Sequence, residues 1–223
     1  MIALSHNISL LSRVVAVDST SSFPRPTPPT PPARQRILAA ALSRFAQDGL
    51  GATSLGAVAT SAGVSTGLVQ HHFRTKTGLI DAVNQHVLQV VADAVASRPL
   101  PAPPTDTLAE LGRRVTSIMT DSPDVVDYLA RALLDGDRLA TSVFDGLVAI
   151  STDQWNQLAE QQLLQAEVDR TWAVLHPLIL VLGTVMLRKE IDRHLPEPLA
   201  TPAQLARWDT AVARLLRSGL LTD

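Results

Sequence analysis

The sequence predicts an all-α protein of about nine helices, in which a small N-terminal helix-turn-helix domain precedes a larger helical domain. Apolar residues recur at helical spacing in nearly every segment after residue 33, and almost no stretch alternates as a β-strand does. A glycine joins two short helical patterns between residues 53 and 76. The 223 residues, of which 46% are hydrophobic, supply a core for both parts. We therefore place the two domains at 33–80 and 81–223.

Residues 1–32 differ from the rest in composition. The stretch from Ser19 to Pro32 is rich in proline, serine and threonine, which favours extended backbone and opposes a packed core. The preceding residues are mildly apolar with one basic residue, Arg13, so no signal peptide is predicted. We expect a disordered arm. It is an inert tail, a stretch added by a start codon placed too far upstream, or an arm whose Arg25 reaches a DNA minor groove.

The first and fourth helices frame the small domain. The first is expected over 33–47, with Asp48-Gly49 as its end signal and an apolar face of Ile37, Leu38, Ala41, Leu42 and Phe45. The fourth is expected from Lys76 to about Ser97, where Arg98-Pro99 stops it. Apolar residues follow one face of this fourth helix along its full length of about 30 Å. It can therefore contact both domains.

Residues 53–76 carry the helix-turn-helix pattern. Thr53 and Ser54 can cap a short helix whose Ala59 is small enough for a close helix crossing. Gly63 then permits the left-handed backbone that ends a helix, and Ser65 can cap the next one. This second helix, 66–73, is expected to be a recognition helix. Its inward residues would be Leu68, Val69, His72 and Phe73, and its outward residues Thr66, Gly67, Gln70 and His71.

Residues 34–82 resemble the DNA-binding domain of the tetracycline-repressor (TetR) family of regulators. The matching segments are RILAAALSRFAQDG (36–49), TS…VATSAGVS (53–65), GLVQHHF (67–73) and KTGLIDAV (76–83). Their order and spacing make the match specific. The resemblance implies a homodimeric transcriptional regulator, most simply a repressor that leaves a palindromic double-stranded DNA operator when a small apolar inducer binds the helical domain.

Within this resemblance, the DNA contacts divide into two groups. The residues expected to hold phosphates are Thr53, Ser54, His72 and Lys76, and those expected at base edges are Thr66, Gly67, Gln70 and His71. Two positions depart from the family. Gln70 stands where an aromatic residue commonly packs against the DNA backbone, and Gly56 stands where many relatives carry a polar or basic contact. Because glutamine can form two hydrogen bonds with adenine, we expect Gln70 to read a base.

Five further helices are expected after the linker at 99–104. The first of them, 107–120, opens with a predicted capping box, Thr107-x-x-Glu110. Ser122-Pro123 opens the next, which ends near Asp135-Gly136. The remaining helices are expected at 138–165, 167–190 and 203–218.

The helix at 167–190 is the most apolar, and Thr171 to Leu187 carries no charge. Seventeen residues that include Pro177 are at the short limit for a membrane span, so we expect a buried helix and no membrane partner. A helix that is apolar on every side must be covered on every side, and a second copy of the chain can supply the cover. The resemblance agrees, since the last two long helices of these regulators pair in a four-helix dimer interface. We expect Leu182 and Leu215 in that interface.

Charge and residue usage bear on the class of function. Residues 33–98 carry six basic and three acidic residues, whereas 99–223 carry eleven basic and seventeen acidic ones. The helix-turn-helix therefore lies in the basic part, as phosphate binding requires. The chain has no cysteine, which fits a reducing compartment, and a cytoplasmic location is expected. No phosphate loop, serine elbow or metal-ligand spacing is present, so we predict neither an enzyme nor a metal or cofactor site.

The inducer site can be predicted only from residue type. The large or polarisable residues of the inner helices are Met119, Tyr128, Phe144, Trp155, Trp172, His176 and Met186. Such residues at helical spacing more often form core than pocket. An alternative remains open, in which the dimeric DNA-binding protein uses its helical domain to bind a protein partner and needs no inducer.

Overall fold

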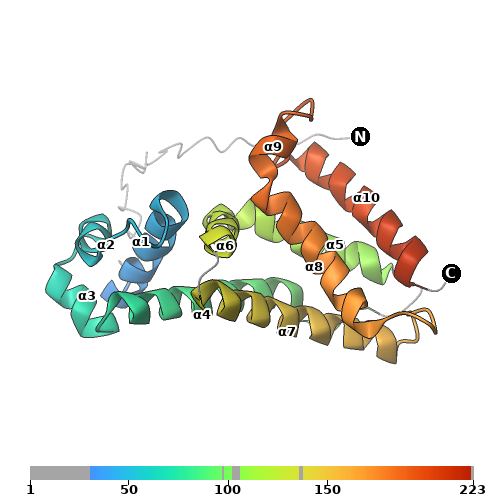
Figure 1. Cartoon of the computed structure of the whole chain (residues 1–223), viewed down its shortest axis with the longest axis horizontal. Coiled ribbons are helices and arrows are strands. Elements are labelled where there is room, and N and C mark those ends of the chain that lie inside the picture. The colour runs from blue at the N-terminus through green and yellow to red at the C-terminus, as the bar shows by residue number, and fades with distance from the viewer. Residues whose placement is uncertain (1–30, 97, 102–105, 136–137, 222–223) are drawn as a thin grey trace, which may run out of the picture. The chain divides into compact units, whose positions relative to one another are not determined.

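The computed structural model describes residues 31–96, 98–101, 106–135 and 138–221. Within these ranges the chain forms ten helices, and its β-structure is limited to one isolated bridge between Leu164 and Leu221. The helices are α1 (Ala33–Asp48), α2 (Leu55–Ala62), α3 (Thr66–Phe73), α4 (Lys76–Ala96), α5 (Thr107–Asp121), α6 (Pro123–Asp135), α7 (Arg138–Glu160), α8 (Arg170–Met186), α9 (Arg188–Asp192) and α10 (Pro202–Leu220) (Figure 1). The predicted all-α class is confirmed. The short α9 is the one helix that the sequence pattern does not separate from its neighbour.

Helices α1–α3, which we call the head, share one apolar core. Helix α1 packs on α2 and α3. Its buried residues are those of the predicted apolar face, Ile37, Ala41, Leu42 and Phe45. Gly49 ends the helix in the left-handed region with φ 87°, and its N–H donates to the Phe45 carbonyl at 3.0 Å. The predicted end signal is therefore correct.

Helix α4 joins the head to the rest of the chain. It packs on α1 and α3 and also on α5 and α7, and Figure 1 shows α4 and α7 running alongside each other. Gly146 permits the close approach of α7, because a Cβ at that position would lie 2.5 Å from Leu88 Cδ1. The helix thus contacts both parts of the chain, as its length predicts.

Helices α5–α10, which we call the body, contribute to two apolar clusters, the larger of which continues through α4 into the head. Where α5 meets α10, the carboxyl group of Asp209 lies in the space left by Gly112, and burial raises the pKa of that carboxyl above its usual value. The predicted capping box is wrong. Asp106, not Thr107, caps α5 by accepting from Ala109 N–H at 3.1 Å, whereas the Thr107 hydroxyl donates to the Pro101 carbonyl at 2.8 Å. Glu110 pairs with Arg113 and Arg114 instead of the backbone.

Helix α8 is shorter and more exposed than the sequence predicts. Asp169 caps it by accepting from the N–H groups of Thr171 and Trp172, and it ends before Leu187. Among the described residues, no helix has the length and apolar character that crossing a membrane requires. Residues 31–223 form one compact unit in which α1 also packs on α6, so the boundary at 80/81 stays a prediction. Residues 1–30 of the predicted arm lie outside the described residues.

Candidate DNA-binding surface and ligand cavity

The turn between α2 and α3 has the geometry that its sequence predicts. Ser54 Oγ accepts from Ala57 N–H at 3.1 Å, and Ser65 Oγ accepts from Leu68 N–H at 3.2 Å, so each hydroxyl caps its helix. Gly63 adopts φ 65° and ψ 42°, and its N–H points to the carbonyls of Ala59 and Thr60. Val64 N–H closes the turn on the Ala59 carbonyl at 3.0 Å. These bonds fix the angle at which α3 leaves α2.

The four residues predicted at base edges are all exposed on α3: Thr66, Gly67, Gln70 and His71. Leu68 is half-buried, and Val69 and Phe73 are buried in the head core. A Cβ at Gly56 of α2 would lie 4.0 Å from Thr66 Oγ1, so the start of α2 is next to the start of α3. Both helix starts therefore lie together on one exposed surface, where N–H groups and hydroxyls can meet phosphates.

The residues predicted to contact phosphate differ in how exposed their side chains are. Ser54 is exposed, and Lys76 is half-buried with its Nζ donating to the Gly51 carbonyl at 3.1 Å. Thr53 is 1% exposed, and its hydroxyl donates to the Gly49 carbonyl at 2.9 Å. Its side chain therefore holds the α1–α2 loop, and the prediction that it contacts phosphate is corrected.

His72 is also corrected. It was expected at the edge of the core, yet it is exposed. Its ring lies edge-on to that of His71, with 5.4 Å between centroids, and 6.2 Å from the ring of Phe73. Both histidines are thus available at the surface of α3.

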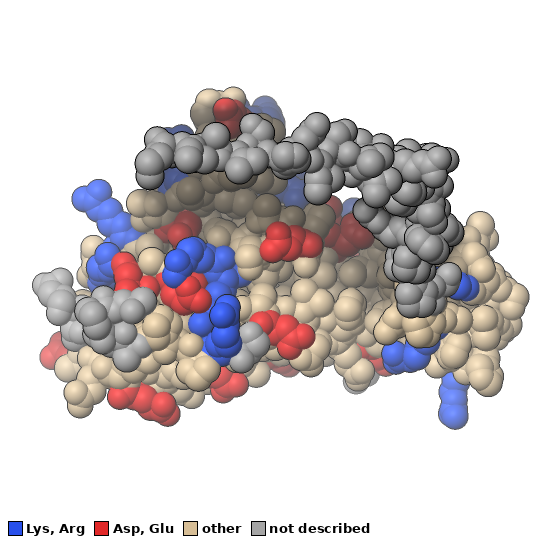
Figure 2. All heavy atoms as spheres, turned by 180° about the vertical axis from the view of Figure 1, so that it is seen from behind, with Lys and Arg blue, Asp and Glu red and all other residues tan. Residues whose placement is uncertain are grey.

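Two arginines beside α3 extend the basic surface, and sequence reasoning did not assign them. Arg74 follows α3 in the left-handed region, with φ 60° and an exposed side chain. The guanidinium of Arg34 lies over the ring of Phe73, 5.3 Å from its centroid. In Figure 2 the end that holds α1–α3, on the right, shows basic side chains among uncharged ones, whereas both charges are mixed at the other end. The signal for Arg74 was its place directly after the recognition helix.

Gly78 sets the distance between α3 and α4. A Cβ at this position would lie 2.5 Å from the Phe73 carbonyl oxygen, which is backbone and cannot turn aside. Gly78 N–H donates to Thr75 Oγ1 at 3.0 Å, which caps the start of α4. The recognition helix is therefore held tightly against α4.

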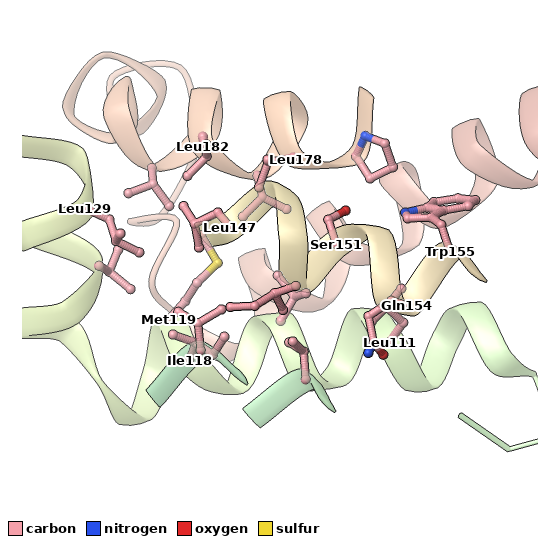
Figure 3. A pocket seen from close by; sticks show the side chains of 18 residues that line it. Leu111, Ile118, Met119, Leu129, Leu147, Ser151, Gln154, Trp155, Leu178 and Leu182 are labelled. Carbon is pink, nitrogen blue, oxygen red and sulfur yellow. The ribbon is translucent and has the colours of Figure 1, made fainter. Parts of the chain in front are cut away.

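The body contains an apolar cavity lined by five helices (Figure 3). Its empty space is about 840 Å³, counting the part open to solvent. The lining residues are Val91 and Val95 of α4; Leu111, Val115, Ile118 and Met119 of α5; Val126 and Leu129 of α6; Leu147, Ile150, Ser151, Gln154 and Trp155 of α7; and Pro177, Leu178, Val181, Leu182 and Val185 of α8. None of these side chains is charged.

Of the seven predicted inducer contacts, only Met119 and Trp155 line the cavity. The other five, Tyr128, Phe144, Trp172, His176 and Met186, do not line it, and their contact with an inducer stays a prediction. Trp172 and His176 stack on each other on the exposed face of α8, with 4.9 Å between ring centroids. Leu182, which was expected in a dimer interface, is 7% exposed and lines the cavity instead.

Tyr128 has a different position, between the head and α4. Its hydroxyl donates to Asn84 Oδ1 of α4, and both residues are buried. Its ring lies 6.5 Å from that of Phe45 of α1, centroid to centroid. The neighbouring residues Val126 and Leu129 on the same helix line the cavity. Helix α6 therefore contacts α1, α4 and the cavity wall at once.

Comparisons with known proteins bear on the head directly. Residues 37–83 match the family model described as "Bacterial regulatory proteins, tetR family". Residues 37–83 are therefore a domain similar to the one that this family shares. The match covers the helix-turn-helix and the start of α4, where the resemblance was predicted.

Two curated regulators are similar to part of this chain. The HTH-type transcriptional regulator BetI of Ectopseudomonas mendocina is 37% identical over 65 residues, which are 29% of this chain and 33% of that protein. The HTH-type transcriptional regulatory protein RaaS of Mycobacterium tuberculosis is 33% identical over 116 residues, 52% of each chain. The matches thus span between a third and about half of these relatives, whose names describe regulators and not enzymes.

The fold is similar to that of a solved structure over most of the chain. The structure of the transcriptional regulator FadR from Bacillus subtilis in complex with stearoyl-CoA superposes with a TM-score of 0.68 at 16% identity. The alignment covers 83% of this chain and 98% of that one. Head and body together therefore have the same fold as that protein.

Proposed function

We propose that this protein is a homodimeric transcriptional regulator that binds operator DNA through α2 and α3 and is released by a small molecule held in the body. The observation that carries the proposal is the exposed surface of α3 inside a matched tetR-type domain. Thr66, Gly67, Gln70 and His71 would meet base edges in the major groove. Ser54, His72 and Lys76 would contact phosphates, joined by Arg74. Such binding requires access to the chromosome, so the proposal includes a cytoplasmic location.

An exposed apolar face on α8 and α10 supports the dimer. Trp172 and Ile179 of α8 are 48% and 49% exposed, and Leu215 of α10 is 60% exposed. Trp172, His176 and Ile179 recur every three or four residues, so they share one side of α8. Exposed apolar residues on one face commonly mark a protein interface. A twofold axis there would present two α3 helices, which fits a palindromic operator with half-sites about one helical turn, ~34 Å, or a multiple apart.

Two helices support control by a ligand. Val91 and Val95 near the end of α4 line the cavity, and the start of the same helix is held against α3 at Gly78. Helix α6 lines the cavity through Leu129 and reaches α1 and α4 through Tyr128. Packed helices move between discrete arrangements, so a ligand wedged among α4–α8 would shift both helices and change the separation of the two α3 helices. FadR of Bacillus subtilis, with the same fold, was solved with stearoyl-CoA.

The DNA-binding part of the proposal is tested with DNA flanking the protein's own gene. Gln70→Ala should weaken binding to the specific site by about 1–3 kcal/mol and spare non-specific DNA. Lys76→Ala should weaken all sequences alike and lower the salt slope by about one. Affinities are measured by fluorescence anisotropy over a range of salt concentrations.

A matched control is Gln85→Ala, which removes an exposed glutamine from α4 and not from α3. It should change neither affinity nor salt slope. A loss of affinity for every sequence in Gln70→Ala would remove Gln70 from base reading. Equal affinity of the wild type for specific and random DNA would contradict the proposed function.

A further inference from the structure

Gln154 is a buried amide in the wall of the body cavity. Its side chain is 3% exposed, and neither Nε2 nor Oε1 has a hydrogen-bond partner among the described residues. Buried amides are nearly always paired, because an unpaired donor or acceptor forfeits its bonds to water without replacement. Two unpaired atoms on one residue of a cavity wall therefore leave room for a hydrogen-bonding partner that enters the cavity, either water or the polar group of a ligand.

The neighbouring side chains do not supply that partner. The hydroxyl of Ser151, one turn before Gln154, donates to the Val174 carbonyl at 3.3 Å. The other cavity residues around Gln154 are apolar apart from the indole N–H of Trp155. Arg114 of α5 is a buried cation, and its guanidinium donates to Glu110 and to the carbonyls of Val95, Arg98 and Pro99. These bonds direct it to the end of α4 and not to the cavity.

We propose that Gln154 recognises the polar end of a neutral, elongated apolar ligand whose end group both donates and accepts a hydrogen bond, as a primary amide does. This inference deepens the proposed inducer function and rests on it for its biological meaning. The Gln154 oxygen accepts from the ligand's N–H, and its NH₂ donates to the ligand's carbonyl. The two amides thereby satisfy each other.

The cavity wall excludes charged ligands. No lining side chain is charged, so a carboxylate or an ammonium group would lose its water without gaining an ion pair. An amide loses less hydration free energy than an ion when it enters the cavity, and its hydrogen bonds to Gln154 replace those to water. The cavity therefore selects a neutral end group over an ionised one on the same chain.

The position of Gln154 also orients the ligand. In Figure 3, Gln154 and Trp155 lie at one end of the cavity and Leu129 lies at the other. A ligand whose polar end binds Gln154 extends its apolar tail toward α6. That helix carries Tyr128, which contacts α1 and α4. The tail is thus the part of the ligand placed to act on the head.

The test uses three probes with the same alkyl chain: decanamide, decanoate and decylammonium. Their binding to the full-length wild-type protein is measured by isothermal titration calorimetry at neutral pH, without DNA. Decanamide should bind, and the two ions should bind at least about a hundredfold more weakly because their charge is buried unpaired. Comparable affinities for decanamide and decanoate, or no binding of decanamide, would overturn the inference.

Gln154→Met tests the residue itself, because methionine keeps the length and the unbranched shape and removes both polar atoms. Decanamide should bind this variant roughly tenfold more weakly. The melting temperature of the free variant should rise, since two unpaired buried atoms are gone. A purely structural role for Gln154 predicts the opposite, a lower melting temperature with unchanged affinity, and that result would overturn the inference.

Asn156→Ala is the matched control on the same helix. Its side-chain amide is exposed and does not line the cavity, so decanamide affinity should stay unchanged. An equal loss of affinity in Asn156→Ala and Gln154→Met would contradict the assignment to Gln154. Because no measurement involves DNA, a failure of the proposed DNA binding leaves the result of this test intact.

Discussion

In the head the stabilising contacts join residues that are close in the sequence, whereas in the body they join residues that are far apart. In the head, the hydroxyls of Thr53, Ser54 and Ser65 are all bonded to backbone groups within nine residues, and short helices close on a compact core. In the body, helices separated by up to a hundred residues enclose an apolar cavity, and the amide of Gln154 is left unpaired. The difference indicates that the head holds a fixed surface for DNA binding, whereas the body has space in which a ligand can change the packing of the helices.

The largest effect is expected from a substitution that separates the two protomers of the proposed dimer and leaves the head of each one folded. Leu215→Asp places a charge on the exposed apolar face of α10. In a monomer the aspartate is solvated, but in the proposed dimer it is buried without a partner, at a cost of several kcal/mol. Light scattering should find monomers with unchanged helix content, and specific DNA binding should be lost.

Leu134→Asp is the control for this change. Leu134 of α6 is 61% exposed, close to the 60% of Leu215, but it lies outside α8 and α10. The control should remain dimeric and bind DNA normally. A Leu215→Asp protein that stays dimeric would show that the dimer uses another surface.

A smaller effect is expected where the head meets the body. Tyr128→Phe keeps the ring beside Phe45 but leaves the side-chain oxygen Oδ1 of buried Asn84 without its donor. The expected loss is about 1–3 kcal/mol in the free energy of unfolding, measured with urea. If the hydrogen bond also couples α6 to α4, the variant should bind DNA with an altered response to a cavity ligand. An unchanged unfolding free energy would indicate that the bond contributes nothing in solution.

The smallest effect is expected at the far end of the body. Bonds from the Ala109 N–H and from Arg217 hold the pKa of the Asp106 carboxyl below its usual value. Because the folded state favours the charged form, this stabilisation is present above the usual pKa, near 3.8, and is lost as the pH falls through the folded value. Asp106→Ala should therefore lower stability at neutral pH by about 0.5–2 kcal/mol and by less in acid.

Asp153→Ala, which removes an exposed carboxylate from α7, provides the comparison for Asp106. Its effect on urea unfolding should be small at every pH. Both variants should bind DNA as the wild type does, since neither residue belongs to the head, α4 or α6. A pH-independent loss in Asp106→Ala would mean that the cap and the Arg217 ion pair are not its cause.

The sequence predicted the head well because its signals are local. Gly63 permits the left-handed backbone that ends a helix, and Ser54 and Ser65 can accept from the free N–H groups at a helix start. Each of these signals lies within a few residues of the feature that it predicts. Thr53 and His72 were misplaced because burial depends on how α1 packs against the loop and on where α3 ends. Neither is a property of the short pattern.

The cavity could not be predicted in the same way, because it exists only where five helices meet. Large residues were taken as pocket residues, yet Tyr128 packs at the head and Trp172 faces outward. The most informative residue was missed. Gln154 stands between Ile150 and Leu158 in the apolar stripe of α7, where a polar residue interrupts an otherwise apolar face. That interruption was a signal in the sequence.

The cavity and the DNA-binding surface of α2 and α3 are expected to be coupled through α4 and α6. The most direct test measures the affinity of a cavity-binding probe such as decanamide with and without specific DNA. Reciprocity requires DNA to weaken probe binding by the same factor by which the probe weakens DNA binding, typically 5- to 150-fold. We expect equal and sizeable factors in the two directions. A probe that binds the cavity with the same affinity in the presence and absence of DNA would contradict the coupling.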